Sequence, residues 1–219
     1  MTRSENDVKG SGKPTRAYRS PRRRAQAQRT RERIVSAAER GFLTNGYAET
    51  SVTAVATAAG VSVDTIYKAF GGKPGLVRAI LARALEGEGP VPAEQRSDQL
   101  QAEEPDPRKI IAGWGRFVTE LAPRGSPLLL LARSAAATDP ELEALLDELD
   151  ASRLTRMRAN ARRLDEAGHL RPGVTVDEAA DVMWTYSSAE LYELLVLRRG
   201  MPLERYGQFV ADAMTAALL

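Results

Sequence analysis

Residues 51–73 read SVTAVATAAGVSVDTIYKAFGGK, and this stretch has the pattern of two short helices joined by a glycine turn. Ser51 and Ser62 are each suited to cap a helix start, and Gly60 to the left-handed conformation that ends a helix. A helix, a turn of about four residues and a second helix form a helix-turn-helix, whose second helix is built to enter the DNA major groove. The pattern therefore predicts DNA binding. Apolar residues at helical spacing predict the buried faces, namely Val52, Val55, Ala56 and Ala59 in the first helix and Val63, Ile66, Tyr67 and Phe70 in the second.

The segment also resembles a known family over residues 25–85. Its continuation TIYKAFGGKPGLVRAI, residues 65–80, follows the helix-turn-helix as in the N-terminal domain of the TetR family of bacterial transcriptional regulators. Asp64 departs from the family pattern, which usually has a small residue there, and its carboxylate is suited to accept from a cytosine amino group. The matching positions are Thr50, Ser51, Val55, Ala56, residues 59–62, residues 65–67, Phe70, Lys73 and Leu76.

The resemblance implies which side chains contact DNA. It places base contacts at the start of the second helix and one groove contact, Thr53, in the first helix. Thymine methyl groups suit Val63, and guanine or phosphate suits Lys68. The alternative for Ser51 and Ser62 is that they only cap their helices, and for Tyr67 that its ring packs; Phe70 we expect in the core with Ile66. The expected base contacts are Ser62, Val63, Asp64, Thr65 and Lys68, and the expected phosphate contacts are Thr50, Ser51, Tyr67 and Lys73.

Charge is distributed unevenly along the chain. Residues 1–33 hold 11 Lys or Arg against three acids, a balance of +8, whereas residues 34–219 hold 20 bases and 26 acids, a balance of −6. A basic end on an acidic remainder suits a protein that places that end against polyphosphate. We expect residues 1–21 to be a disordered basic arm. Its arginines, with those that follow, resemble arms that enter the minor groove, the alternative being a solvated tail; they are Arg16, Arg19, Arg22, Arg23 and Arg24.

Composition limits the other classes of function. The 219 residues contain no cysteine and one histidine, His169, which we expect to cap a helix end. We therefore expect no metal site built on nitrogen or sulfur ligands, no cofactor and no enzymatic activity. FGGKPG lacks the Ser/Thr of a phosphate-binding loop, since Pro74 follows Lys73. Neither a transmembrane-length apolar run nor a signal peptide is apparent, so we expect a cytoplasmic protein without membrane contact.

The fold class we predict is all-α. A three-helix helix-turn-helix domain over residues 22–86 precedes a flexible linker at 87–106, with a short helix around 96–102, and a larger helical domain at 107–219. We expect the first helix to begin between Arg22 and Ala27. Later helices are predicted at 107–122, 127–137, 139–167, 175–198 and 202–218, separated by Pro and Gly.

The family resemblance further implies a homodimer that reads a palindromic operator, and release of DNA by an unknown small-molecule effector. The apolar faces of the last two helices support the dimer, with Leu191, Leu195, Tyr206, Phe209, Val210, Ala213 and Met214 as interface candidates. For the residues that could bind the effector, the alternative interpretation is ordinary core packing. For Arg133, the alternative is an ion pair within the chain. These candidates are Trp114, Phe117, Leu121, Leu129, Arg133, Met157, Trp184 and Tyr186. The alternative function is a constitutive or architectural DNA-binding protein without an effector pocket.

Overall fold

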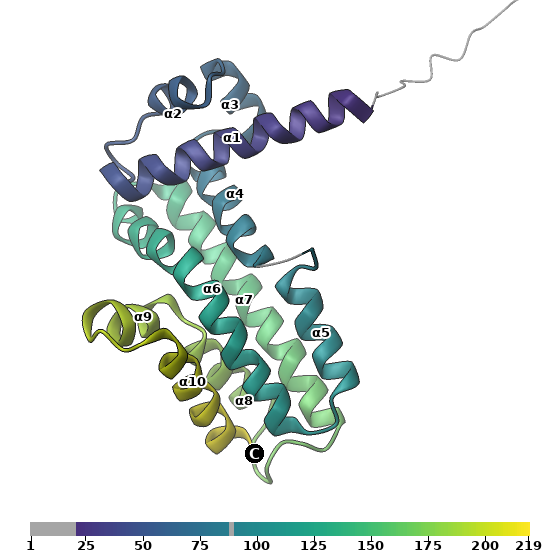
Figure 1. Cartoon of the computed structure of the whole chain (residues 1–219). Helices are drawn as coiled ribbons and strands as arrows, with labels where there is room; N and C mark the ends of the chain where they lie inside the picture. Colours follow the sequence, from purple (N-terminus) through teal and green to yellow (C-terminus); the bar gives the residue numbers. More distant parts are fainter. Residues whose placement is uncertain (1–20, 88–89) are drawn as a thin grey trace, which may run out of the picture.

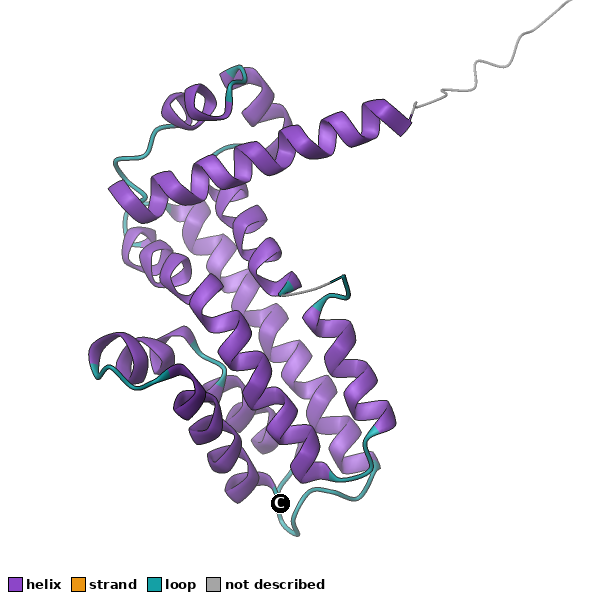
Figure 2. Ribbon diagram, in the orientation of Figure 1, coloured by secondary structure: helices purple, strands orange, loops and turns teal. Residues whose placement is uncertain are grey.

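The computed structural model describes residues 21–87 and 90–219, and all regular structure in these residues is helical (Figure 1). This confirms the predicted all-α class. Four helices form a small head at one end, and the remaining helices form an elongated body (Figure 2). The head contains α1 (Pro21–Asn45), α2 (Val52–Ala59), α3 (Val63–Phe70) and α4 (Lys73–Glu86). The body contains α5 (Ala93–Glu103), α6 (Pro107–Ala136), α7 (Pro140–Glu166), α8 (Val176–Tyr186), α9 (Ala189–Tyr192), the π-helical turn η1 (Glu193–Arg198) and α10 (Leu203–Leu218).

Two hydrophobic cores lie along the same pair of long helices. The first core contains the buried faces of α1–α4 together with Leu128 and Ala132 of α6 and residues 142–146 of α7. The second core joins the start of α6 and the end of α7 to α8 and α10, with Trp114 and Tyr206 among its large buried side chains. The head is therefore completed by side chains that lie more than 40 residues later in the chain.

Helix α6 is continuous where the sequence predicts two helices, at 107–122 and 127–137. It contains Pro123 and Pro127 in its interior. Each proline removes one helical hydrogen bond and costs about 3 kcal/mol in an exposed helix. The helix carries buried residues of the second core before Pro123 and of the first core after Pro127, so packing at both ends holds it continuous.

The helix predicted at 175–198 is instead broken after Tyr186. Thr175 caps α8 in a reciprocal capping box with Glu178. Ser188 then caps α9, since its hydroxyl accepts from the Leu191 amide at 3.3 Å. A serine hydroxyl that accepts from a backbone amide at a helix N-terminus favours the start of a second helix over one continuous helix. The apolar periodicity of residues 175–198 does not reveal this break.

Helix α5 lies in the region expected to be a linker. It confirms the short helix predicted near 96–102 and extends it to 93–103. Ser97 of α5 accepts a hydrogen bond from the Trp114 indole at 3.1 Å, and Arg96 forms two hydrogen bonds with Glu120, at 2.9 and 2.5 Å. These contacts fasten α5 along α6.

Helices α6 and α10 cross at close range. A Cβ on Gly115 would lie 2.6 Å from the Gly207 carbonyl oxygen, and a Cβ on Gly207 would lie 2.7 Å from the Gly115 oxygen. Both values are below ordinary contact, so each backbone occupies the space that a side chain would need. Glycine at both positions is what permits α10 to lie directly on α6.

Candidate nucleic-acid interface

The turn between α2 and α3 is fixed by two serine caps and one glycine. Ser51 accepts from the Ala54 amide at 3.0 Å, and Ser62 accepts from the Thr65 amide at 3.1 Å. Gly60 ends α2 at φ 64°, a left-handed conformation that residues with a Cβ rarely adopt. Ile66 on the inner side of α3 is fully buried. The predicted helix-turn-helix is therefore present, and the capping role of both serines is confirmed.

The outer side of α3 presents the predicted base-contacting residues. Asp64 and Lys68 stand one turn apart and form an exposed ion pair at 2.7 Å. Ser62 and Thr65 share a hydroxyl–hydroxyl hydrogen bond of 2.8 Å. Tyr67 is 53% exposed, so its ring is available at the surface and is not packed in the core. Among the other candidates, Ser51 and Thr53 are exposed, whereas Val63 is partly buried against the first core.

Two residues that were expected to contact phosphates form hydrogen bonds within the head. Thr50 is 3% exposed, and its hydroxyl donates to the Gly46 carbonyl at 2.8 Å. Lys73 donates to the carbonyls of Tyr47 and Ala48 at 2.6 and 3.3 Å. Its ammonium also lies 4.2 Å from the centre of the Tyr47 ring. Both side chains hold the loop between α1 and α2 in the absence of DNA, and their contact with phosphates stays a prediction.

The arginines of the expected arm divide between two regions. Residues 1–20, with Arg16 and Arg19, lie outside the described residues. Arg22, Arg23 and Arg24 are exposed in the first turn of α1. These three therefore belong to α1, which begins at Pro21, one residue before the expected range, and their contact with DNA stays a prediction.

Sequence reasoning missed contacts between residues distant in the chain. The Arg31 guanidinium lies 4.5 Å from the centre of the Phe70 ring. Phe70 is partly buried and packs against the first core, at its edge. Tyr47 donates its hydroxyl to Asp139 at 2.7 Å. These pairs are 39 and 92 residues apart, and no local pattern signals them.

Most effector candidates in the body make internal contacts. Trp114 is buried and bonded to Ser97, and the Phe117 ring lies under the Arg96 guanidinium at 5.1 Å. Arg133 pairs with Asp150 at 3.0 Å and with Glu190, as the internal ion-pair alternative requires. The others, Leu121, Leu129, Met157, Trp184 and Tyr186, are partly buried.

Trp184 has the least satisfied polar atom of this set. Its indole nitrogen is buried without a hydrogen-bond partner in the described residues. The Arg153 guanidinium lies 4.3 Å from its ring centre and also donates to the Trp184 carbonyl at 2.5 Å. Burial lowers the pKa of Arg153, with Asp150 opposing this shift and Arg133 adding to it. The arrangement offers a hydrogen-bond donor beside a partly desolvated cation.

The expected dimer face is only partly accessible. Tyr206, Val210 and Met214 are at most 3% exposed, and Leu195 is 8% exposed. These four pack in the second core of their own chain and leave little surface for a partner chain, and their place in an interface stays a prediction. Leu191 and Ala213 are partly buried, and Phe209 is 40% exposed in edge-to-face contact with Tyr186. Two leucines of η1, Leu194 and Leu197, are more than half exposed and were not among the candidates.

Residues 34–80 match the family model of the bacterial regulatory proteins, tetR family. The HTH-type transcriptional regulator TtgR of Pseudomonas putida is 40% identical over 80 residues, which are 32% of this chain and 38% of TtgR. Similar folds occur in a putative TetR-family regulator from Rhodococcus sp. and in the SmeT–triclosan complex. The family model and the match to TtgR both point to the TetR family.

The two solved structures extend the likeness to the body. The Rhodococcus protein has a TM-score of 0.68 at 18% identity and covers 88% of this chain and 100% of its own. SmeT has a TM-score of 0.65 at 22% identity and covers 87% and 91%. At these identities the likeness shows the fold. The family model covers α2, α3 and the turn, and its bounds lie after the arginine-rich start of α1 and before the body.

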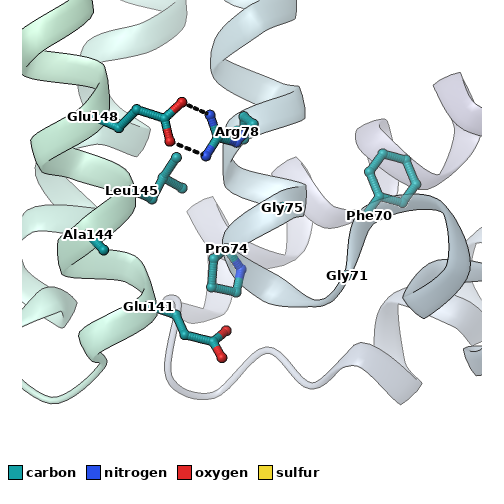
Figure 3. A pocket seen from close by; sticks show the side chains of 9 residues that line it. All are labelled: Phe70, Gly71, Pro74, Gly75, Arg78, Glu141, Ala144, Leu145 and Glu148. Atoms are coloured by element: carbon teal, nitrogen blue, oxygen red, sulfur yellow. Dashed lines mark hydrogen bonds and ion pairs between the residues drawn. The ribbon is translucent and has the colours of Figure 1, made fainter.

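A groove of about 420 Å³ separates the end of α3 and the start of α4 from α7 (Figure 3). Arg78 of α4 and Glu148 of α7 close one side of it through paired hydrogen bonds of 2.5 and 2.7 Å. None of the predicted effector residues lines this groove. Its lining is Phe70, Gly71, Pro74, Gly75, Arg78, Glu141, Ala144, Leu145 and Glu148.

Two further features are absent from the part of the chain that the structure describes. Residues 21–87 and 90–219 contain no cluster of three or more His, Cys, Asp or Glu side chains arranged to hold a metal ion. None of their helices has the length and apolarity needed to cross a membrane.

Proposed function

We infer that this protein is a sequence-specific, DNA-binding transcriptional regulator. The observation that carries this function is the exposed start of α3, held by the Ser62 cap and by buried Ile66. A helix presented in this way after a glycine turn suits the DNA major groove. The match to TtgR spans 38% of that relative.

Base recognition in this proposal combines one apolar and two charged side chains. Val63 meets a thymine methyl group, and Asp64 accepts from a cytosine amino group. Lys68 exchanges its ion pair with Asp64 for a guanine or a phosphate. Ser51, Thr53, Thr65 and Tyr67 are exposed or partly exposed nearby and supply the positioning contacts.

The proposed assembly is a homodimer on a palindromic operator. Phe209, Leu194 and Leu197 are large apolar side chains exposed on α10 and η1. Large apolar side chains exposed on two contacting helical segments favour a partner surface, and a two-fold axis pairs equal surfaces. Two heads related by that axis then read two half-sites about one or more helical turns apart.

The proposed regulation is release of DNA by a small molecule bound in the body, so that the protein acts as a repressor. The solved SmeT structure, of similar fold, contains triclosan. In this chain the buried Trp184 donor beside Arg153 suits an effector with a hydrogen-bond acceptor. The internal ion pairs of Arg133 favour the rival function, a constitutive DNA-binding protein whose body takes no ligand.

Selection from random genomic fragments, followed by footprinting at two salt concentrations, tests the function. The proposal predicts recovery of one palindrome with two protected half-sites. Uniform retention of all fragments, lost steeply as salt rises, would instead support a charge-driven architectural protein. Titration of the recovered duplex complex with a chemically varied compound set then tests release.

A further inference from the structure

The first half of α1, residues 21–33, projects beyond the rest of the head (Figure 1). We call these residues the basic projection. They contain six arginines and a single acid, Glu32. The first buried residue of α1 is Ile34, so the basic projection adds nothing to the hydrophobic cores. Its charge and exposure therefore need an explanation other than folding of the head.

The arginines occupy both sides of the projecting helix. At 100° per residue, Arg22, Arg29 and Arg33 fall within about 40° of one another, on the side opposite the buried residues Val35, Ala38 and Phe42. Arg24 and Arg31 lie on the other side, and Arg31 there covers the Phe70 ring at the end of α3. Glu32 is engaged by Gln28 through a 2.9 Å hydrogen bond. Among the described residues, the structure records no ion pair for any of these arginines.

This arrangement is unfavourable for an isolated helix. The N-terminus of a helix carries partial positive charge, and Arg22, Arg23 and Arg24 add three cations to that end. The segment also lacks an apolar face that could pack against another element. A polyanion would relieve the repulsion along its whole length, since no acid of the described residues forms an ion pair with these arginines.

We propose that the basic projection binds the phosphate backbone of DNA outside the half-site that α3 reads. This inference rests on the proposed DNA-binding function and extends its contact surface. Arg22 lies nine residues before Arg31, about 14 Å along the helix axis. Measured along the duplex axis, that length corresponds to about four phosphates of one strand at ~3.4 Å each. A helix about 10 Å wide does not fit a minor groove about 6 Å wide, so the contact follows the backbone and does not enter the groove.

The test compares two full-length triple variants by fluorescence anisotropy over a range of salt. Arg22→Gln, Arg24→Gln and Arg29→Gln remove three charges from the projection, and Gln has nearly the helix propensity of Arg. The matched control, Arg108→Gln, Arg162→Gln and Arg171→Gln, removes three exposed arginines from the far end of the body. The probe is a duplex carrying the selected site with about ten extra base pairs, roughly one helical turn, on each side.

The proposal predicts a salt slope reduced by up to ~2.7 per head for the projection variant, since each phosphate contact contributes about 0.9. The control variant should keep the wild-type slope. Trimming the extra base pairs should lower wild-type affinity and leave the projection variant nearly unaffected. Equal slopes for both triple variants, or a slope that falls only after deletion of residues 1–20, would overturn the proposal.

Base preference separates this inference from the proposed function. The projection variant should select the same operator sequence as the wild type, because α3 is unchanged. If the wild type retains all sequences equally, the proposed sequence-specific regulator fails, yet the slopes on that non-specific DNA still test the projection. Circular dichroism melting of both variants checks that each is folded.

Discussion

The Tyr47 hydroxyl donates to Oδ2 of Asp139 at 2.7 Å and thereby ties the loop after α1 to the start of α7. Asp139 is also the cap of α7, since it accepts from the Leu142 amide at 3.1 Å. Lys73 of α4 donates to the Tyr47 carbonyl at 2.6 Å. Three segments of the head and body thus meet at one tyrosine, which is 4% exposed.

Replacement of Tyr47 by Phe should destabilise the fold. The change keeps the ring contact with Phe42 and removes the hydrogen bond to a charged acceptor, which is worth about 2 kcal/mol. Urea unfolding at pH 7 measures the loss. An unchanged free energy of unfolding would mean that water replaces the tyrosine hydroxyl at no cost.

Low pH should weaken the contact between Tyr47 and Asp139 and so lower the free energy of unfolding. Burial opposes ionisation of Asp139, but hydrogen bonds from Tyr47 and from the amides of Leu142 and Glu141, with the charge of Lys73, give it a net lowered pKa. A carboxyl whose pKa is lower in the folded state stabilises above its unfolded pKa, and this stability is lost as pH falls through the folded pKa. Asp139→Asn should therefore flatten the decline of unfolding free energy between about pH 5 and pH 2. A decline as steep as that of the wild type would assign the acid sensitivity to other carboxyls.

The glycine crossing of α6 and α10 predicts opposite results for two alanine substitutions. Gly207→Ala places a Cβ against the Thr119 methyl and 2.7 Å from the Gly115 oxygen, so it should cost about 1–3 kcal/mol. Gly125→Ala, in the same helix as Gly115, meets only Ala84 at 3.7 Å and should stabilise by about 0.5–1 kcal/mol through helix propensity. Thermal unfolding of both variants gives the comparison, and equal melting temperatures would contradict it.

Neighbouring residues of α10 should separate assembly from folding. Phe209→Asp changes a side chain that is 40% exposed, so we expect a folded monomer with weakened operator binding. Val210→Asp buries a charge at a position with no exposure and should unfold the chain. Sedimentation velocity and circular dichroism distinguish these results. A Phe209→Asp protein that remains dimeric would place the interface elsewhere.

Asp64→Asn should raise DNA affinity and reduce selectivity. Removal of the carboxylate frees the Lys68 ammonium, 2.7 Å away, and removes repulsion from phosphates. One acceptor for a cytosine amino group becomes an amide that can also donate, so discrimination at one base pair should fall on the order of tenfold. Competition binding with single-base operator variants measures this change. A loss of affinity for all sequences would indicate that Asp64 only supports the α3 helix.

Local patterns predicted the head well because its signals are local. Serine caps at Ser51 and Ser62 and the left-handed Gly60 each act within four residues, and the helix-turn-helix follows from them. The body was harder because long-range packing decided it. The two prolines inside α6 and the burial of Tyr206 in its own chain depend on partners distant in sequence. Periodicity could not show which apolar residues of α10 are exposed. A face that packs inside its own chain and a face that is free for a partner have the same apolar pattern.

The sharing of α6 and α7 between both cores bears on how such proteins diversify. A head transplanted with residues 21–86 alone would leave Leu76, Ile80 and their neighbours without the side chains of residues 128–146 that cover them. Recombination between relatives at the connection before α5 would therefore join mismatched surfaces. Operator preference should be exchangeable by grafting only the exposed residues of α3. The residues of α6 and α7 that cover the head should be inherited together with the head against which they pack.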